Sequence, residues 1–154
     1  MASTLKVKIQ EEILLDNQDY GSKRILEISS INEISKRILT ITTNESTIAT
    51  FSGAVASSGH YNDSAVRYMR FTNKDDTYFI TLTFRNQDND EVAIKVDAGQ
   101  SFIWCGDNAS GMSSVFNATQ DADAASDTAF GSLTNIQADA EASTVDIEMF
   151  VASV

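Results

Sequence analysis

Few side chains in this 154-residue sequence can act as nucleophiles or general bases. His60 is the only histidine and Cys105 the only cysteine, so a site with several histidine ligands is excluded and one Cys–His pair is available. Cys105 ends the apolar run 102–105, where a free cysteine usually packs as a small buried hydrophobic residue. The segment Ser58-Gly59-His60 lacks the Gly-x-Ser-x-Gly pattern of serine hydrolases. We therefore predict that the protein is not an enzyme.

Two acidic segments offer oxygen ligands of the kind that calcium prefers. Asp121 and Asp123 begin a stretch like an EF-hand loop, but Ser126 replaces the sixth-position glycine and Ser132 the final glutamate. The segment 88–90 (Asp-Asn-Asp) is better explained as a solvated hairpin turn. We predict no metal and no cofactor, while an enzyme with paired carboxylates remains an alternative because the sequence does not give their separation.

The chain is predicted to consist mainly of strands. Apolar residues alternate with polar ones in three runs: 77–85, 91–97 and 144–151. A period of two is typical of a strand with one buried face. In the first run, Tyr78 and Leu82 belong to the apolar set. Further strands are predicted at 4–15, 23–31, 34–43, 47–51, 66–72 and 101–105, with a weaker one at 130–138.

The fold class predicted from these runs is all-β, as a single antiparallel β-sandwich of jelly-roll type. For 23–43 a helix is the alternative, since Ile28, Ile31, Ile34 and Ile38 are spaced to line one helical face, but the many β-branched residues favour strands. The whole chain, 1–154, is expected to form one domain.

The connections between the runs also lead to predictions. Short polar segments rich in Asn, Asp and Gly usually join antiparallel neighbours, so we expect the strands between residues 66 and 105 to form a four-stranded meander. Residues 16–22 are predicted to be a turn and 52–64 an exposed loop. The stretch 106–126 is predicted to be a long flexible loop.

The acidic composition limits the classes of molecule that the protein is expected to bind. The chain has 22 Asp and Glu against 11 Lys and Arg, a formal net charge of −11, so nucleic acid and anionic membranes are expected to be repelled. The sequence shows neither a signal peptide nor a membrane-spanning run. One cysteine agrees with synthesis in a reducing cytoplasm.

Self-association is predicted from two features. The chain contains no proline, so no strand edge is protected by that residue, and unprotected edges favour pairing between subunits. In the strand 101–105, both faces are apolar, so one face is expected to meet a second subunit or the 106–126 loop. An ordinary core strand that is buried on both faces is the alternative. We predict a homo-oligomer, with a trimer favoured, and the interface candidates are large apolar residues: Tyr61, Phe102, Trp104, Met112 and Phe116.

Four stretches, 66–73, 75–84, 92–103 and 145–154, share a style of strand and turn that resembles small virion structural proteins of tailed phages, particularly marine ones. The resemblance implies a β-sandwich with no enzyme activity and no chemical residues to carry over. It implies a capsid decoration or cement protein, with a tail or fibre adhesin that binds host-surface glycan as the alternative. Other virion proteins, such as a major capsid protein, would then be partners, and the protein would be made in the host cytoplasm and reside in the virion.

Overall fold

The computed structural model of the chain describes residues 3–54, 57–106, 112 and 133–154. These residues form strands and no α-helix, which confirms the predicted all-β class. In chain order the strands are β1 (Ser3–Glu11), β2 (Leu14–Leu15), β3 (Gln18–Asp19), β4 (Ser22–Ile31), β5 (Glu33–Ile41), β6 (Ser46–Ser52), β7 (His60–Asn62), β8 (Val66–Asn73), β9 (Ile80–Asn86), β10 (Glu91–Val96), β11 (Ser101–Cys105), β12 (Leu133–Ala140) and β13 (Val145–Ser153).

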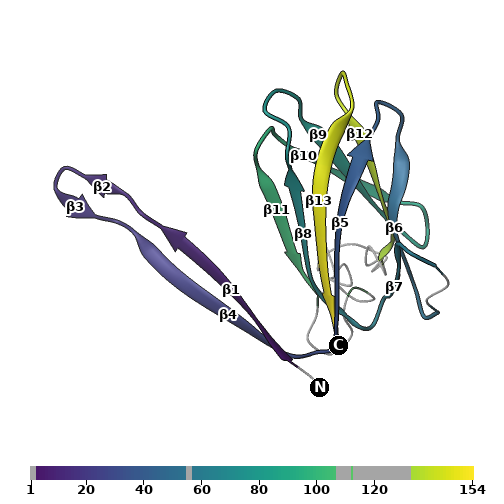
Figure 1. Ribbon diagram of the computed structural model, residues 1–154, viewed down its shortest axis with the longest axis horizontal. Coiled ribbons are helices and arrows are strands. Elements are labelled where there is room, and N and C mark those ends of the chain that lie inside the picture. Colours follow the sequence, from purple (N-terminus) through teal and green to yellow (C-terminus); the bar gives the residue numbers. More distant parts are fainter. Residues whose placement is uncertain (1–2, 55–56, 107–111, 113–132) are drawn as a thin grey trace, which may run out of the picture.

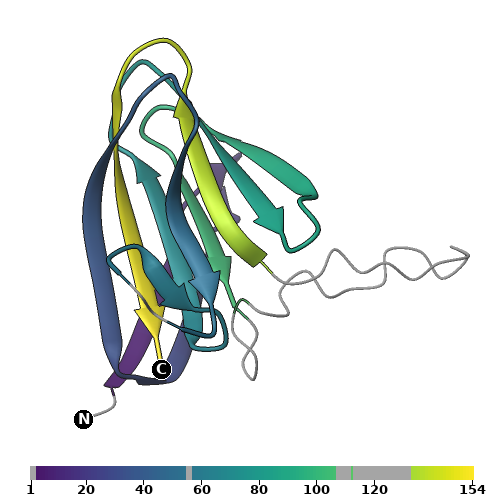
Figure 2. The same ribbon diagram turned by 90° about the vertical axis from the view of Figure 1, so that its right-hand side faces the viewer.

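Nine of these strands build two sheets that pack face to face (Figures 1 and 2). One sheet has five strands in the order β10-β9-β12-β6-β7, and the other has four in the order β11-β8-β13-β5. All neighbours are antiparallel except β6 and β7, which run parallel. The structure therefore confirms that two mainly antiparallel sheets pack together as a β-sandwich.

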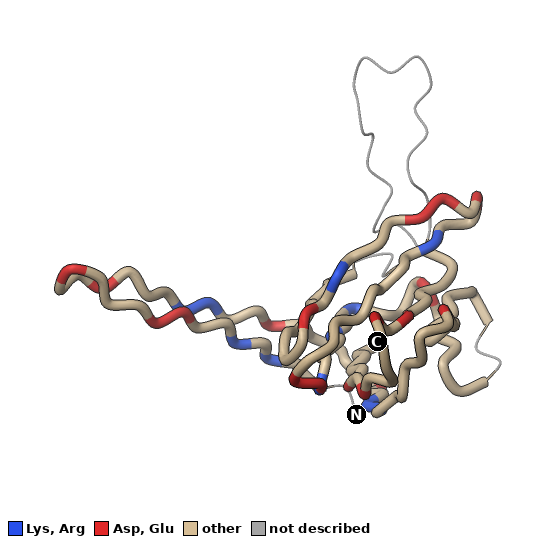
Figure 3. The backbone as a smooth tube through the Cα atoms, turned by 90° about the horizontal axis from the view of Figure 1, so that it is seen from above, with Lys and Arg blue, Asp and Glu red and all other residues tan. Residues whose placement is uncertain are grey.

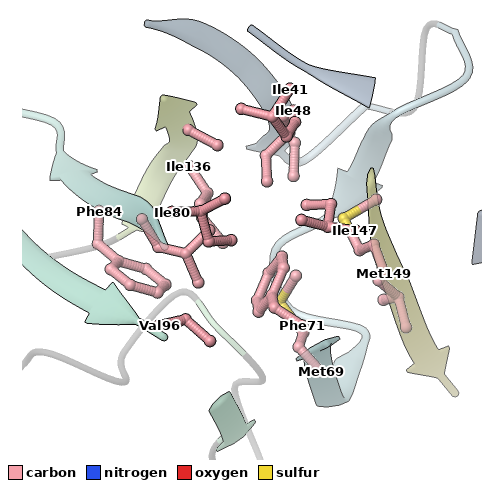
Figure 4. Packing of buried hydrophobic residues seen from close by; sticks show 14 of the residues in the cluster. Ile41, Ile48, Met69, Phe71, Ile80, Phe84, Val96, Ile136, Ile147 and Met149 are labelled. Carbon is pink, nitrogen blue, oxygen red and sulfur yellow. The ribbon is translucent and has the colours of Figure 1, made fainter. Parts of the chain in front are cut away.

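The alternating runs place their apolar sets between the sheets. Ile80, Leu82 and Phe84 of β9 are fully buried, as are Ile147 and Met149 of β13 (Figure 4). Because β9 and β13 are both flanked by strands on each side, neither can shift by one residue without turning its apolar set toward water. The period of two is thus fixed by the core.

Edge strands follow the same pattern less strictly. In β10, which pairs only with β9, Val96 is buried, but Val92 at the other end is 40% exposed. Sequence alternation alone marks both residues as core positions. Val92 is exposed because β10 lies at the edge of its sheet, where the opposite sheet does not cover this end of the strand.

The meander prediction for residues 66–105 is wrong. β8 and β11 pair in the four-stranded sheet, while β9 and β10 pair in the other, so only the β9–β10 hairpin joins neighbours. The connection from β8 to β9 crosses between the sheets and is fastened by Asn73, which is 1% exposed. Its Nδ2 donates to the carbonyls of Tyr78 and Val96 at 2.9 and 3.2 Å. Packed sheets lie about 10 Å apart, so a short connection can span them.

Several boundaries also differ from the sequence expectation. The predicted strand 4–15 ends at Glu11 and resumes as β2, which pairs with β3 inside the segment expected to be a turn. The predicted loop 52–64 contains β7. Residues 23–43 form β4 and β5, so the strand prediction is confirmed over the helical alternative. The weak strand at 130–138 is β12, a central strand of the five-stranded sheet.

The first two long strands lie outside the sandwich. β1 and β4 pair as a two-stranded hairpin that projects from one end of the molecule, with β2 and β3 at its far end (Figure 1). We call residues 3–31 the arm and residues 11–20 the arm tip. Asp16 and Asn17, with φ of 51° and 62°, form the turn at its apex, which is the left-handed pair that tight hairpins need.

Candidate functional site

The arm has one apolar face. Cross-strand partners lie on the same side of a hairpin, and the register pairs Leu5 with Ile28 and Val7 with Leu26. At the base, Leu5, Val7 and Ile28 pack on the outer surface of the four-stranded sheet, in a cluster completed by Ile31, Tyr68, Phe150 and Ala152. The base of the arm is therefore held by its own sandwich.

Farther out, the arm's apolar side chains are uncovered. The described residues include twelve large apolar side chains that are exposed, and seven of them lie in the arm: Ile9, Ile13, Leu14, Leu15, Tyr20, Ile25 and Leu26. Leu14 is 71% exposed. A two-stranded hairpin is marginal without packing, so this surface is expected to have a partner.

Charge is also unevenly spread along the arm (Figure 3). The arm tip holds Glu11, Glu12, Asp16 and Asp19 and has no Lys or Arg. Asp19 Oδ1 accepts a hydrogen bond from the backbone N–H of Gly21 at 2.7 Å, and Glu11 accepts one from Ser22. The Asp16 side chain makes no hydrogen bond or ion pair with the described residues. The apex thus presents an unpaired carboxylate beside exposed leucines.

A second feature is a cleft at the edge of the sandwich where β5 lies near β6, with a volume of about 440 Å³. It lies between β5, the first part of β6 and residues 58–60, and we call it the edge cleft. Leu39, Ile41 and Ile48 supply apolar walls, and hydroxyl groups come from the Ser and Thr residues of β6. None of its lining residues is Asp or Glu, which is notable in so acidic a chain.

Arg37 gives the edge cleft a cation. Its Nη1 atom is buried and has no hydrogen-bond partner within the described residues. A Cβ atom on Gly59 would come within 3.0 Å of this nitrogen, and Gly59 has a φ of +89°. Glycine is therefore needed both for the backbone turn and for the space that the guanidinium occupies. A buried donor without a partner is costly. Because Arg37 also lines the edge cleft, an acceptor bound there would meet a guanidinium that its own chain leaves partly unsatisfied.

The predicted interface residues take different places. Tyr61 on β7 is 9% exposed and its hydroxyl hydrogen-bonds Ser35 Oγ at 3.1 Å. Met112 is fully buried, and its backbone N–H donates to the Asp63 carbonyl. Phe116 lies outside the described residues, as does most of the predicted loop 106–126.

Phe102 and Trp104 point into the sandwich. Both are partly buried and pack against Phe84, with ring centroids 5.7 and 4.5 Å apart. The other face of β11, with Ile103 and Cys105, lies on the outer surface of the sheet, and Ile103 is 40% exposed. In the single chain, the aromatic face thus serves core packing, and the exposed face of β11 is the aliphatic one.

The structure separates the two residues considered for nucleophilic chemistry. His60 lies on β7, the edge of the five-stranded sheet next to the edge cleft. Cys105 lies on β11, over the β9 end of that sheet. The expectation that Cys105 is buried is wrong, because it lies on the outer face of an edge strand and is exposed. Neighbouring groups still desolvate the thiol enough to raise its pKa.

The acidic segment 88–90 forms the β9–β10 turn. Asn86 Oδ1 accepts hydrogen bonds from the backbone N–H groups of Asp88 and Asp90 at 2.9 and 2.8 Å. Asn86 Nδ2 donates to Asp90 Oδ2, so one carboxylate is engaged within the turn. Asp121 and Asp123 are outside the described part of the chain. No cluster of three or more potential metal ligands occurs among the residues that the structure describes.

An ion-pair network lies on the outer face of the four-stranded sheet. Lys36 Nζ is 3.1 Å from Glu148 Oε2, and Arg70 contacts the other carboxylate oxygen. The hydrogen bond from Lys36, assisted by Arg70, lowers the pKa of Glu148 below its ordinary value of 4.5. Since a lowered carboxyl pKa stabilises the fold only while the group is ionised, this contribution is lost as pH falls through the folded-state pKa.

We accordingly expect Glu148→Gln to lower the melting temperature at pH 7, with a loss of about 1 kcal/mol, which is the upper range for partly exposed pairs. The difference from the parent should shrink below pH 4.5 and vanish once Glu148 is protonated in both states. Thermal melts from pH 7 to pH 3 measure it, with Glu12→Gln at the arm tip as a control that leaves the melting temperature unchanged. A difference that persists at the lowest pH would assign the loss to packing.

Sequence reasoning missed the arm and the edge cleft. The sequence does carry one sign of the arm tip: Ile13, Leu14, Leu15 and Tyr20 flank the turn at 16–17, where polar residues are usual. Nothing local indicates the edge cleft, because β5, β6 and residues 58–60 meet there only through the sheet arrangement.

Comparisons of the chain with protein-family models, with curated proteins and with solved structures find no match. Among the described residues, no helix has the length and apolar character needed to cross a membrane.

Proposed function

We propose that this protein is a non-enzymatic structural component of a tailed-phage virion, in the role of a capsid decoration or cement protein. The observation that carries the proposal is the combination of a packed β-sandwich with a projecting arm whose outer apolar side chains are uncovered. Such an arm is suited to joining a subunit to its neighbours. The resemblance of four sequence stretches to virion proteins points to the same role.

The strand order supports a jelly roll as the finer fold class. Setting aside the arm and the short β7, the eight strands β5, β6 and β8–β13 follow one another in alternate sheets, except for the β9–β10 hairpin. The resulting orders, β5-β13-β8-β11 and β6-β12-β9-β10, are those of two interleaved Greek keys. Viral capsid domains are among the proteins built on this arrangement, and lectin domains are others.

A homo-oligomer, with a trimer as the leading expectation, is part of the proposal. β5, β7, β10 and β11 are edge strands of the two sheets, and proline is absent from the chain. Ile34 and Ile38 on β5 are also exposed on the outer sheet face. Edges and apolar side chains of this kind favour subunit contacts. The partners would be further copies of the chain and a major capsid protein.

The alternative is a tail or fibre adhesin that binds glycan. Sugar recognition commonly uses exposed aromatic rings, but Tyr61 is buried and Trp104 packs against Phe84. This placement favours the decoration role. Glycan-array binding that is lost in Trp104→Ala, in a variant that circular dichroism shows to be folded, would reverse the preference.

Mass spectrometry of purified virions tests the proposed role directly. We expect the protein in many copies per particle, and we expect limited dissociation of the particle to release it from the shell rather than from the tail. Detection in tails alone would favour the adhesin. Absence from intact particles would contradict a virion role of either kind.

A further inference from the structure

We propose that the arm tip of one copy binds in the edge cleft of a second copy, where the Asp16 carboxylate pairs with Arg37. This inference rests on the proposed structural role and adds the surfaces through which copies join. The two surfaces lie on the same chain, so each copy offers one of each. The occupant of the edge cleft is therefore another copy of this protein.

The arm tip and the edge cleft are complementary in charge. The arm tip carries four acidic residues and no basic one, whereas the lining of the edge cleft contains Arg37 and no acidic residue. Both surfaces have a group without a partner among the described residues: the Asp16 carboxylate at the apex and the buried Arg37 Nη1. A carboxylate placed on a partly desolvated guanidinium forms a strong charge-assisted hydrogen bond.

The arm tip also carries exposed apolar side chains that a partner can cover. Ile13, Leu14, Leu15 and Tyr20 are each more than half exposed around the apex. The edge cleft has a volume of about 440 Å³, which has room for side chains of the tip. In its wall Leu39 is partly buried, whereas Ile41 and Ile48 are already buried in the core. Burial of the tip's apolar side chains supplies the free energy of association, and the ion pair fixes the register.

The arrangement of the chain makes this contact intermolecular. The arm joins the sandwich at the start of β5 and extends from there past β11, away from β6 and β7, which border the edge cleft (Figure 1). The arm of a copy thus points away from its own cleft. Because the two surfaces differ, the contact is head to tail, so it closes into a ring or continues as a filament. A ring of three copies corresponds to the expected trimer.

Sedimentation velocity of the full-length protein over a range of concentrations tests the inference. We expect the parent to form oligomers, and we expect Asp16→Asn and Arg37→Gln each to weaken association about thirtyfold or more, the usual effect of breaking a buried charged pair. The variant with both changes should associate no more weakly than either single variant, because the two groups act on each other. This coupling distinguishes a direct contact from a loss of folding.

Matched controls separate the arm tip from other surfaces. Asp76→Asn alters an exposed carboxylate in a turn of the sandwich and should leave association unchanged. Leu14→Ser should weaken association about tenfold or more, whereas Val154→Ser, at an exposed apolar position outside the edge strands, should not. Thermal melts of each variant check folding. Asn at position 16 suits the left-handed backbone there.

A monomeric parent at the highest concentration would overturn the inference, as would effects of Asp16→Asn and Arg37→Gln that are simply additive. These outcomes are independent of the particle experiment. A protein found in virions but monomeric in solution would retain the proposed function and lose this contact. An oligomer with the expected coupling that is absent from virions would keep the contact and lose the proposed function.

Discussion

Leu82→Asp is expected to prevent the chain from folding. Leu82 is fully buried on β9, between β10 and β12, with Ile94 and Ala138 as its cross-strand partners. An unpaired buried carboxylate costs about 3–5 kcal/mol, and the lost leucine packing adds about 2–5 kcal/mol. Domains are stable by only about 5–15 kcal/mol, so the change removes most or all of the stability.

Circular dichroism and a thermal melt of the purified variant measure this outcome. Thr81→Asn is the control, since Thr81 is the neighbouring residue on the other face of the sheet, where its cross-strand partners are Lys95 and Asp139. The control should fold with a melting temperature near that of the parent, because the new amide is uncharged and faces polar partners. If Leu82→Asp melted like the parent, the assignment of this face of β9 to the core would be incorrect.

Phe84→Ala should give the second largest effect, a loss of about 3–5 kcal/mol with the fold retained. The Phe84 ring is fully buried and lies against Phe71, Phe102 and Trp104, with the Phe71 centroid 6.5 Å away. Truncation leaves a cavity where the two sheets meet. For a chain of this size, the melting temperature should fall by about 10 °C, as differential scanning calorimetry can measure.

Phe79→Ala is the control for this prediction. Phe79 is only partly buried, and Lys95 Nζ lies 4.4 Å from its ring centroid, an interaction worth about 0.5–1 kcal/mol. Its loss should therefore be clearly smaller than that of Phe84→Ala. Equal losses would mean that the aromatic cluster around Phe84 is no more important to stability than a surface ring.

Asn residues organise two of the connections between strands. The acidic turn at 88–90 is organised by Asn86, and the β8–β9 crossing by Asn73. In both cases a buried amide satisfies backbone groups that a turn leaves unpaired. Turn formation thus accounts for the Asn residues of these two connections.

The local sequence pattern is enough to predict the central strands β9 and β13 and the faces that they bury. The alternation in 77–85 and 144–151 predicts which side chains of β9 and β13 lie in the core, and Ile80, Leu82, Ile147 and Met149 are all fully buried. This success has a local cause: successive side chains of a strand point to opposite faces, so the pattern along the chain is also the pattern across the sheet.

Which strands pair, and where the apolar surface remains open, depends on how distant parts of the chain come together. A short polar connection fits a hairpin and a crossing between sheets equally well, so the predicted meander was wrong for β8 and β11. An alternating strand needs one covered face, but the pattern does not say what covers it. Cys105 is exposed on an edge strand, and the arm tip projects beyond its own sandwich, because pairing partners and sheet edges are set by contacts between residues far apart in the sequence.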